Sequence, residues 1–331
     1  MRIGILGAGG MGRTHAAAYT RIPGVEVAAI VGRREPKVKE LAAKLGVPGL
    51  TDPWSVLEDD AIDAIDITYP TFIHREYVIA ALERGKHVFC ETPMALSVDD
   101  ADAMIAAAQS RRRIFMVALL MRFVAEYVFI HDAVASGDLG QPLVAFANRL
   151  SAPYWSPERD PARFGEPAVE LMIHDFDYLN WLFGVPVTVS GTGMVGPSGV
   201  VDYAFVLLQF GGPLAMVEGS AMMPKSFPFS TSARVLCEEG MLETSFRFEG
   251  DGIRKILRRF PSKGDAEPLE VPGEDPYEAE CEYFVRCLRG EADPTFLGAE
   301  VARNALRVSL AARDSLASGK PVSLGLDRPD G

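Results

Sequence analysis

The 331-residue chain has few of the residues that build disulfide frameworks or metal centres. It contains four cysteines, which form no CxxC pair, and five dispersed histidines. Scattered cysteines of this kind are typical of reduced thiols in a reducing compartment. We therefore expect no disulfide framework and no metal.

An excess of positive charge and a long apolar run are also missing. Asp and Glu number 45 against 33 Lys and Arg, which gives a formal net charge of -12. Nucleic acids and anionic membranes attract basic surfaces, so neither is expected as the main partner. No apolar run approaches the length of a membrane span, and no cleavage signature follows the apolar N-terminal residues. These absences predict a cytoplasmic globular protein.

Glycine is concentrated at the start of the chain, where MRIGILGAGGMG contains Gly7-x-Gly9-x-x-Gly12. Residues 2–6 have the apolar pattern of a buried strand, and a helical pattern begins at Met11. Glycines at such a junction permit a tight turn, the approach of a pyrophosphate and close packing of the helix on the strand. The helix N-terminus offers N–H groups and its positive dipole end to phosphates. This segment predicts a dinucleotide-binding domain.

Strands and helices alternate through the first 120 residues. Strands are predicted at 25–31, 64–68, 87–90 and 114–119, with helices at 36–45, 74–84 and 97–109 between them. Alternation of this kind is typical of an α/β fold with a parallel, doubly wound sheet. We therefore predict a Rossmann dinucleotide-binding domain over residues 1–120.

The remainder, 121–331, is predicted as an α+β domain for substrate binding and oligomerisation, with a large, mostly antiparallel open sheet. Helices are expected at 125–136, 168–183 and 301–318, and strands at 143–150, 201–210, 214–222, 230–237 and 241–248. Both alternating faces of 201–210 are largely apolar. If one face packs on helices and the other on a second subunit, the protein is a homodimer or homotetramer.

The residues that follow the second strand bear on the choice of cofactor. An acidic residue there accepts a hydrogen bond from the ribose 2′-OH of NAD, whereas arginine pairs with the 2′-phosphate of NADP. Gly32, Arg33 and Arg34 follow the strand here, and no acidic residue occurs before Glu35. NADP is therefore predicted, with NAD as the other option. The alternative is that the arginines are only solvated loop charges.

Four segments in this order resemble the Gfo/Idh/MocA family, named for glucose–fructose oxidoreductase and inositol dehydrogenase. They are the Gly7–Gly12 fingerprint, Pro70-Thr71-x-x-His74, Glu91-Thr92-Pro93 and His174-Asp175. The resemblance covers nearly the whole chain. It implies hydride exchange between NAD(P) and a small carbohydrate-like substrate, and a C-terminal sheet that often joins subunits. The expected cofactor-binding residues are Gly7, Gly9, Gly10, Met11, Gly12, Gly32, Arg33, Arg34, Pro70, His74 and Glu91, although His74 at a helix start is as well explained by capping or packing.

The catalytic motif of the family departs from its pattern in this chain. The resemblance implies Glu-Lys-Pro, whose lysine shuttles the proton of the substrate hydroxyl, where this chain has Thr92. A threonine hydroxyl forms hydrogen bonds but does not titrate near neutrality. Lys86 precedes the strand at 87–90 and so is expected at the opposite edge of the sheet.

The family's second catalytic site corresponds to His174, and its Asp four residues earlier corresponds to Glu170. On one helix, Glu170 and Asp177 would share a face with His174. A carboxylate there would raise the pKa of the imidazole and suit a proton donor for carbonyl reduction. The alternatives are an incidental polar face and, less favoured, a carboxylate–His–carboxylate metal site.

The sequence gives less information on the residues that contact the substrate than on those that bind the cofactor. Arg122 matches an Arg-Phe of the family, with an ordinary ion pair as the alternative, and Asp175 adjoins His174. Tyr154, Trp155 and Arg163 lie in a Pro-rich loop, and loops often line sites.

Three hypotheses of function follow from these residues. The first is an NADP-dependent oxidoreductase that acts on a sugar, a cyclitol or a related alcohol or carbonyl. The second is a non-catalytic NADP-binding regulator or sensor, which the loss of the family lysine suggests. The third is a dehydrogenase whose substrate is acidic enough to need no lysine.

Overall fold

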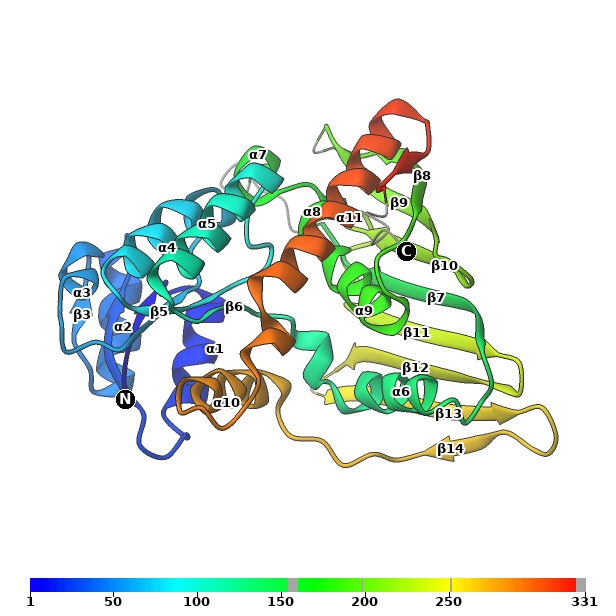
Figure 1. Ribbon diagram of the computed structural model, residues 1–331, viewed down its shortest axis with the longest axis horizontal. Coiled ribbons are helices and arrows are strands. Elements are labelled where there is room, and N and C mark those ends of the chain that lie inside the picture. The colour runs from blue at the N-terminus through cyan, green and yellow to red at the C-terminus, as the bar shows by residue number, and fades with distance from the viewer. Residues whose placement is uncertain (154–159, 198, 251, 326–331) are drawn as a thin grey trace. The chain divides into compact units, whose positions relative to one another are not determined.

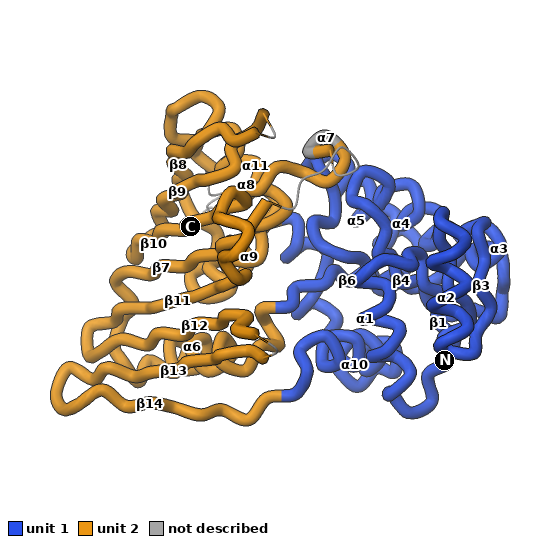
Figure 2. The backbone as a smooth tube through the Cα atoms, turned by 180° about the vertical axis from the view of Figure 1, so that it is seen from behind, with its two compact units in different colours: residues 1–120, 274–303 blue, residues 121–273, 304–331 orange. Residues whose placement is uncertain are grey.

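The computed structural model describes residues 1–153, 160–197, 199–250 and 252–325, which form two compact units (Figure 2). Unit 1 contains Met1–Leu120 and Glu274–Arg303, and unit 2 contains Met121–Gly273 and Asn304–Gly331. Residues 274–303 therefore cluster with the first 120 residues, whereas the sequence analysis placed them in the second domain. The long helix α11 (Ala299–Ser318) begins in unit 1 and continues in unit 2.

Unit 1 is built on a six-stranded sheet with the order β3-β2-β1-β4-β5-β6, and every strand pair in it is parallel. Helix α1 packs beside α10, and α4 packs beside α5 (Figure 1). This is the predicted Rossmann sheet. Its elements are β1 (Arg2–Leu6), α1 (Gly10–Tyr19), β2 (Glu26–Val31), α2 (Glu35–Leu45), β3 (Gly49–Leu50), α3 (Trp54–Leu57), β4 (Ala64–Ile67), η1 (Thr71–Ile73), α4 (His74–Glu83), β5 (His87–Cys90), α5 (Val98–Arg111), β6 (Phe115–Val117), α10 (Pro276–Leu288) and η3 (Pro294–Leu297).

Unit 2 is built on a nine-stranded sheet with the order β14-β13-β12-β11-β7-β10-β9-β8-β15. Its strand pairs are antiparallel except for β7 with β10, which confirms the mostly antiparallel sheet. Its elements are η2 (Leu120–Phe123), α6 (Ala125–Ser136), β7 (Pro142–Leu150), α7 (Pro161–Phe164), α8 (Pro167–Glu170), α9 (Ile173–Phe183), β8 (Thr188–Val195), β9 (Val201–Gln209), β10 (Leu214–Ser220), β11 (Ser230–Cys237), β12 (Gly240–Glu249), β13 (Gly252–Pro261), β14 (Glu267–Leu269), the rest of α11 and β15 (Val322–Ser323).

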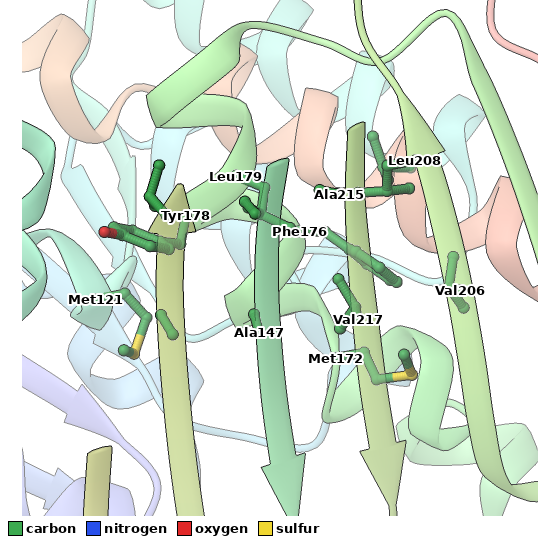
Figure 3. Packing of buried hydrophobic residues seen from close by; sticks show 14 of the residues in the cluster. Met121, Ala147, Met172, Phe176, Tyr178, Leu179, Val206, Leu208, Ala215 and Val217 are labelled. Carbon is green, nitrogen blue, oxygen red and sulfur yellow. The ribbon is translucent and has the colours of Figure 1, made fainter. Parts of the chain in front are cut away.

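The two faces of the nine-stranded sheet differ in burial. Helices α6, α8 and α9 pack on one face, where Phe176 of α9 lies close to Ala215 and Val217 of β10 (Figure 3). Along β9 the alternate side chains are exposed. The predicted alternation of 201–210 therefore places one apolar face in the core and leaves the other uncovered within this unit.

The helix predicted at 168–183 is broken into α8 and α9, which corrects the sequence analysis. The carbonyl of Met172 accepts hydrogen bonds from the N–H groups of Asp175 and Phe176, so a new helix begins there. The side chain of Met172 lies against the backbone of β10, since a Cβ placed on Gly219 would be 2.4 Å from Met172 Cγ. This contact with the sheet fixes the break. Within the described ranges, no helix is long and apolar enough to cross a membrane.

Candidate functional site

The turn between β1 and α1 has two kinds of glycine. A Cβ on Gly7 would lie 2.0 Å from Thr68 Oγ1, and one on Gly12 would lie 2.0 Å from the Gly7 carbonyl oxygen. Gly7 also has a φ of 147°. These two glycines are needed because the first turn of α1 packs directly on the strands.

Gly9 and Gly10 are exposed and have no described atom within 4 Å of their Cβ positions. Gly9 is the N-cap of the ten-residue helix α1, and no side chain of the described residues caps its first N–H groups. Met11 follows in the first turn and is partly exposed. The open backbone and the helix dipole fit the pyrophosphate of a dinucleotide.

Arg33 and Arg34 are exposed at the carboxyl end of β2, directly after the buried Gly32. The first acidic residue, Glu35, forms an ion pair of 2.7 Å with Lys39, and this hydrogen bond lowers the pKa of the Glu35 carboxyl. Glu35 is therefore engaged on its own helix. The position where a dinucleotide-binding fold meets the adenosine ribose is basic in this chain.

The Thr92–Pro93 turn follows β5 and contains a cis peptide bond. The Thr92 N–H donates a hydrogen bond to Glu91 Oε2 at 3.1 Å. Thr92 Oγ1 is buried and has no hydrogen-bond partner in the part of the chain that the structure describes. A hydroxyl in this state is available to a bound ligand.

His74 contacts the backbone of this turn, which fits the packing alternative, and its role in binding the cofactor stays a prediction. Its ring is 1% exposed, with Nδ1 3.1 Å from the Pro93 carbonyl oxygen and Nε2 2.6 Å from the Tyr69 carbonyl oxygen. Burial lowers the pKa of the imidazole. Both ring nitrogens are thus engaged by backbone. Pro70, from the same motif, is the N-cap of η1.

Lys86 lies away from this edge of the sheet, as predicted. Its Nζ donates hydrogen bonds to the carbonyl oxygens of Asp59 and Ile62, at 2.5 and 2.9 Å. Both residues precede β4, so the ammonium group is at the amino edge. It cannot replace the family lysine.

His174 occupies the first turn of α9, and its electrostatic environment is opposite to the prediction. Burial and the positive charge of Arg149 lower the pKa of His174 to about 3. Glu170 is the last residue of α8 and therefore does not share a helix with His174. The expectation that carboxylates raise this pKa is wrong, and the ring is neutral at pH 7.

The carboxylates near His174 in sequence belong to buried ion pairs. Arg122 binds Asp177 through two contacts, Nε–Oδ2 at 3.0 Å and Nη2–Oδ1 at 2.9 Å. Arg149 binds Asp175 in the same way, at 2.9 and 3.3 Å. Arg122 is 6% exposed and Asp175 is 0% exposed. These pairs fit the alternative of an ordinary ion pair for Arg122, and the substrate contacts of Arg122 and Asp175 stay predictions.

Other predicted contacts are not tested by this geometry. Tyr154 and Trp155 lie outside the described residues. Arg163 lies in the short helix α7, and its N–H donates to the Asp160 carbonyl oxygen at 2.9 Å.

A buried polar cluster in unit 1 was missed by the sequence analysis. His15 of α1 has Nδ1 2.9 Å from Asp66 Oδ2, and its Nε2 lies 3.2 Å from Glu91 Oε1 and 3.9 Å from Glu280 Oε1. Ligand atoms of His15, Asp66 and Cys281 lie within 4.8 Å of one another. A sequence signal exists in Asp66, a charged residue inside an otherwise apolar strand. Glu91, predicted to bind the cofactor, faces this cluster.

Two family models match the chain. Residues 1–119 match the GFO_IDH_MocA model, described as an oxidoreductase family with an NAD-binding Rossmann fold, and residues 127–243 match the GFO/IDH/MocA C-terminal domain. Together the two matches reach from the glycine turn into the nine-stranded sheet.

Individual proteins are similar over comparable lengths. The chain is 28% identical to scyllo-inositol 2-dehydrogenase (NAD(+)) of Bacillus subtilis, over 99% of this chain and 97% of that relative. It is 30% identical to inositol 2-dehydrogenase 4 of Saccharopolyspora erythraea, over 72% of each chain. The crystal structure of a probable dehydrogenase from Thermotoga maritima superposes with a TM-score of 0.83 at 27% identity, covering 98% of both chains.

Proposed function

The chain belongs to the Gfo/Idh/MocA oxidoreductase family, and on that premise we propose that it transfers hydride between a nicotinamide dinucleotide and a cyclitol, sugar or related alcohol. Relatives named as inositol dehydrogenases support this substrate class. The observation that carries the proposal in this chain is the open N-terminus of α1 at Gly9 and Gly10.

The dinucleotide is proposed to be NADP, on the basis of Arg33 and Arg34. Each charge-assisted contact with the 2′-phosphate is worth about 1.5–3 kcal/mol. NADPH should bind more tightly than NADH, and Arg33→Ala with Arg34→Ala should remove most of that difference. Lys44→Ala, which removes an exposed charge from the other end of α2, is the control. Equal affinity for the two dinucleotides in the unmodified protein, measured by fluorescence titration, would overturn the assignment.

His174 is proposed as the group that accepts the proton of the substrate hydroxyl during oxidation. The bound dinucleotide supplies the carbon that exchanges hydride. The lowered pKa of His174 keeps the imidazole neutral with a free lone pair, and it also makes the ring a weaker base than an ordinary histidine. In the direction of carbonyl reduction, the same ring returns the proton. Glu170, at the end of the preceding helix, is proposed to orient His174.

Thr92 is the observation that favours the second candidate, a dinucleotide-binding regulator. Its hydroxyl offers a hydrogen bond but no titratable proton near neutrality. A screen of inositols, sugars and small aldehydes with NADP(H) and NAD(H), followed at the nicotinamide absorbance, separates the two. Turnover of any of them supports the oxidoreductase. Binding of the dinucleotide with no turnover across the screen would favour the regulator.

We further propose that the uncovered face of the nine-stranded sheet joins subunits in a homodimer or homotetramer. Leu207 of β9 pairs in register with Met216 of β10, which pairs with Phe146 of β7, so apolar side chains form a continuous row. Leu207 and Met216 are 40% and 39% exposed. Leu207→Glu should release monomers in sedimentation, and Ile253→Glu, at an exposed position on β13, is the control. A wild-type monomer at micromolar concentration would refute this assembly.

A further inference from the structure

The carboxylate cluster around His15 has no role in the chemistry proposed above. Its members come from four elements of unit 1: His15 from α1, Asp66 from β4, Glu91 from the end of β5 and Glu280 from α10. We propose that His15 is a positioning residue whose imidazolium, held between Asp66 and Glu91, fixes Glu91 and thereby the Thr92–Pro93 turn. The effect on catalysis rests on the proposed function, whereas the charge and the turn geometry do not.

The contacts form a continuous chain from α1 to the turn. His15 Nδ1 and Asp66 Oδ2 are 2.9 Å apart, and both side chains are fully buried. His15 Nε2 and Glu91 Oε1 are 3.2 Å apart, an ion pair whose N–H is not aligned as a hydrogen bond. The other oxygen of Glu91 accepts the Thr92 N–H at 3.1 Å. A change of charge at His15 therefore reaches Thr92 through one intervening side chain.

The charges of the cluster favour the imidazolium. Burial alone would lower the pKa of His15, but the carboxylates of Asp66 and Glu91 together raise it well above its usual value. Burial and the same two carboxylates raise the pKa of Glu280, which favours its neutral form. Tyr19 and Cys281 also face the cluster with raised pKa values, so both stay neutral at pH 7. The positive charge of His15 then balances the carboxylates beside it.

Without that charge, the Glu91 carboxylate would lie next to a neutral ring and lose its ion pair in a largely buried site. The side chain would then turn toward water, and this weakens its hold on the Thr92 N–H. The turn lies at the carboxyl edge of the parallel sheet, which is where ligands bind in doubly wound folds. A displacement there should lower the rate of hydride transfer more than the affinity for dinucleotide, whose phosphates we assign to Gly9 and Gly10.

The first experiment measures the charge and the turn in the protein without substrate. Imidazole ¹⁵N NMR near pH 8 should show both His15 nitrogens protonated, with the signal assigned by its loss in His15→Gln. The Thr92 amide signal should shift in His15→Gln and stay in place in His87→Gln. His87 is the matched control because it accepts the Ile114 N–H at the amino end of β5. A neutral His15, an unmoved Thr92 amide, or a stoichiometric divalent metal in elemental analysis would overturn the proposal.

The second experiment uses the enzyme. His15→Gln should lower kcat by about 10–100-fold, as small displacements of reacting groups do, with dinucleotide affinity within about threefold of wild type. Glu91→Gln keeps an oxygen for the Thr92 N–H and should lose less. The two losses should be strongly non-additive in the double variant, because both act through one contact. Additive losses would contradict the mechanism. If wild type shows no turnover, the proposed function fails and the NMR result still decides the role of His15.

Discussion

The two units place a histidine in opposite electrostatic surroundings. In unit 1, His15 lies among carboxylates that raise its pKa well above the usual value despite burial. In unit 2, burial and the charge of Arg149 lower the pKa of His174 to about 3. Both residues lie within the first two turns of a helix. The charged neighbours supplied by the fold, and not the place on the helix, decide which ring carries a proton.

The two histidines differ in pKa because the carboxylates near them have different partners. Asp175 and Asp177 follow His174 on α9, but each binds a buried arginine, Arg149 or Arg122. The carboxylates are neutralised, and the nearby guanidinium acts on His174. Around His15 the carboxylates of Asp66 and Glu91 are left to the imidazole itself. The first arrangement keeps the imidazole neutral, and the second suits a fixed positive charge.

The largest expected effect tests the proton acceptor. His174→Ala should lower turnover by about 10²–10⁴-fold and leave NADPH affinity nearly unchanged, because general-base catalysis contributes that much and the ring is not assigned to the dinucleotide. Steady-state kinetics and fluorescence titration measure the two quantities. His131→Ala is the control, since His131 of α6 stacks on Trp181 in the same unit. Glu170→Gln should have a smaller effect.

Full turnover in His174→Ala on a genuine substrate would remove His174 from the mechanism. The proton would then pass to water, to substrate or to a loop residue such as Tyr154, which lies outside the described residues. The two histidines would still differ in pKa, but the pKa of His174 would have no role in catalysis.

The next effect is on stability. Asp175→Ala leaves the Arg149 guanidinium buried without its carboxylate, and breaking a buried pair costs about 3–5 kcal/mol. Urea unfolding should show this loss, whereas Asp132→Ala, an exposed carboxylate on α6, should change stability by less than about 0.5 kcal/mol. Equal stability of the two variants would mean that Arg149 finds water in place of Asp175, and the buried pair would then contribute no stability.

The sequence predicted the parts of this comparison that depend on local pattern. The glycine turn, the alternating strands and the Ser97 cap follow from periodicity and backbone chemistry, and Ser97 Oγ does accept the Asp100 N–H. The break between α8 and α9 was missed because it depends on Met172 meeting Gly219, a contact between distant residues. The arginine partners of Asp175 and Asp177 were missed for the same reason, since Arg149 and Arg122 lie on other elements.

The cluster around His15 was missed although its residues are visible in the sequence. Asp66 and Glu91 lie on or beside apolar strands, where a charged residue is a signal of a buried partner. Glu280 is supplied by α10, from the segment 274–303 that returns to unit 1 after strands β7 to β14 of unit 2. No local pattern predicts such a return. The sequence therefore indicates that partners exist, and the topology identifies them.

The smallest effect is a pH dependence of stability with opposite sign in the two units. His174 titrates near 6.5 when unfolded and near 3 when folded, so its contribution is complete above pH 6.5 and is lost as the pH falls below it. The folded-state pKa of His15 is raised, so its contribution is complete below pH 6.5 and is lost as the pH rises toward the folded value. Each slope is at most about 1.4 kcal/mol per pH unit, and partial exposure reduces that of His174.

Urea unfolding at a series of pH values measures how the free energy of unfolding depends on pH. Relative to wild type, His174→Gln should flatten this dependence on the acid side, and His15→Gln should flatten it above about pH 7. Glu280 contributes a loss of the same sign as His15, so the variant must be compared with wild type at each pH. If both variants flatten the curve on the same side of neutral pH, the two histidines have the same kind of electrostatic environment. That result would contradict the opposite environments argued from Asp66 beside His15 and Arg149 near His174.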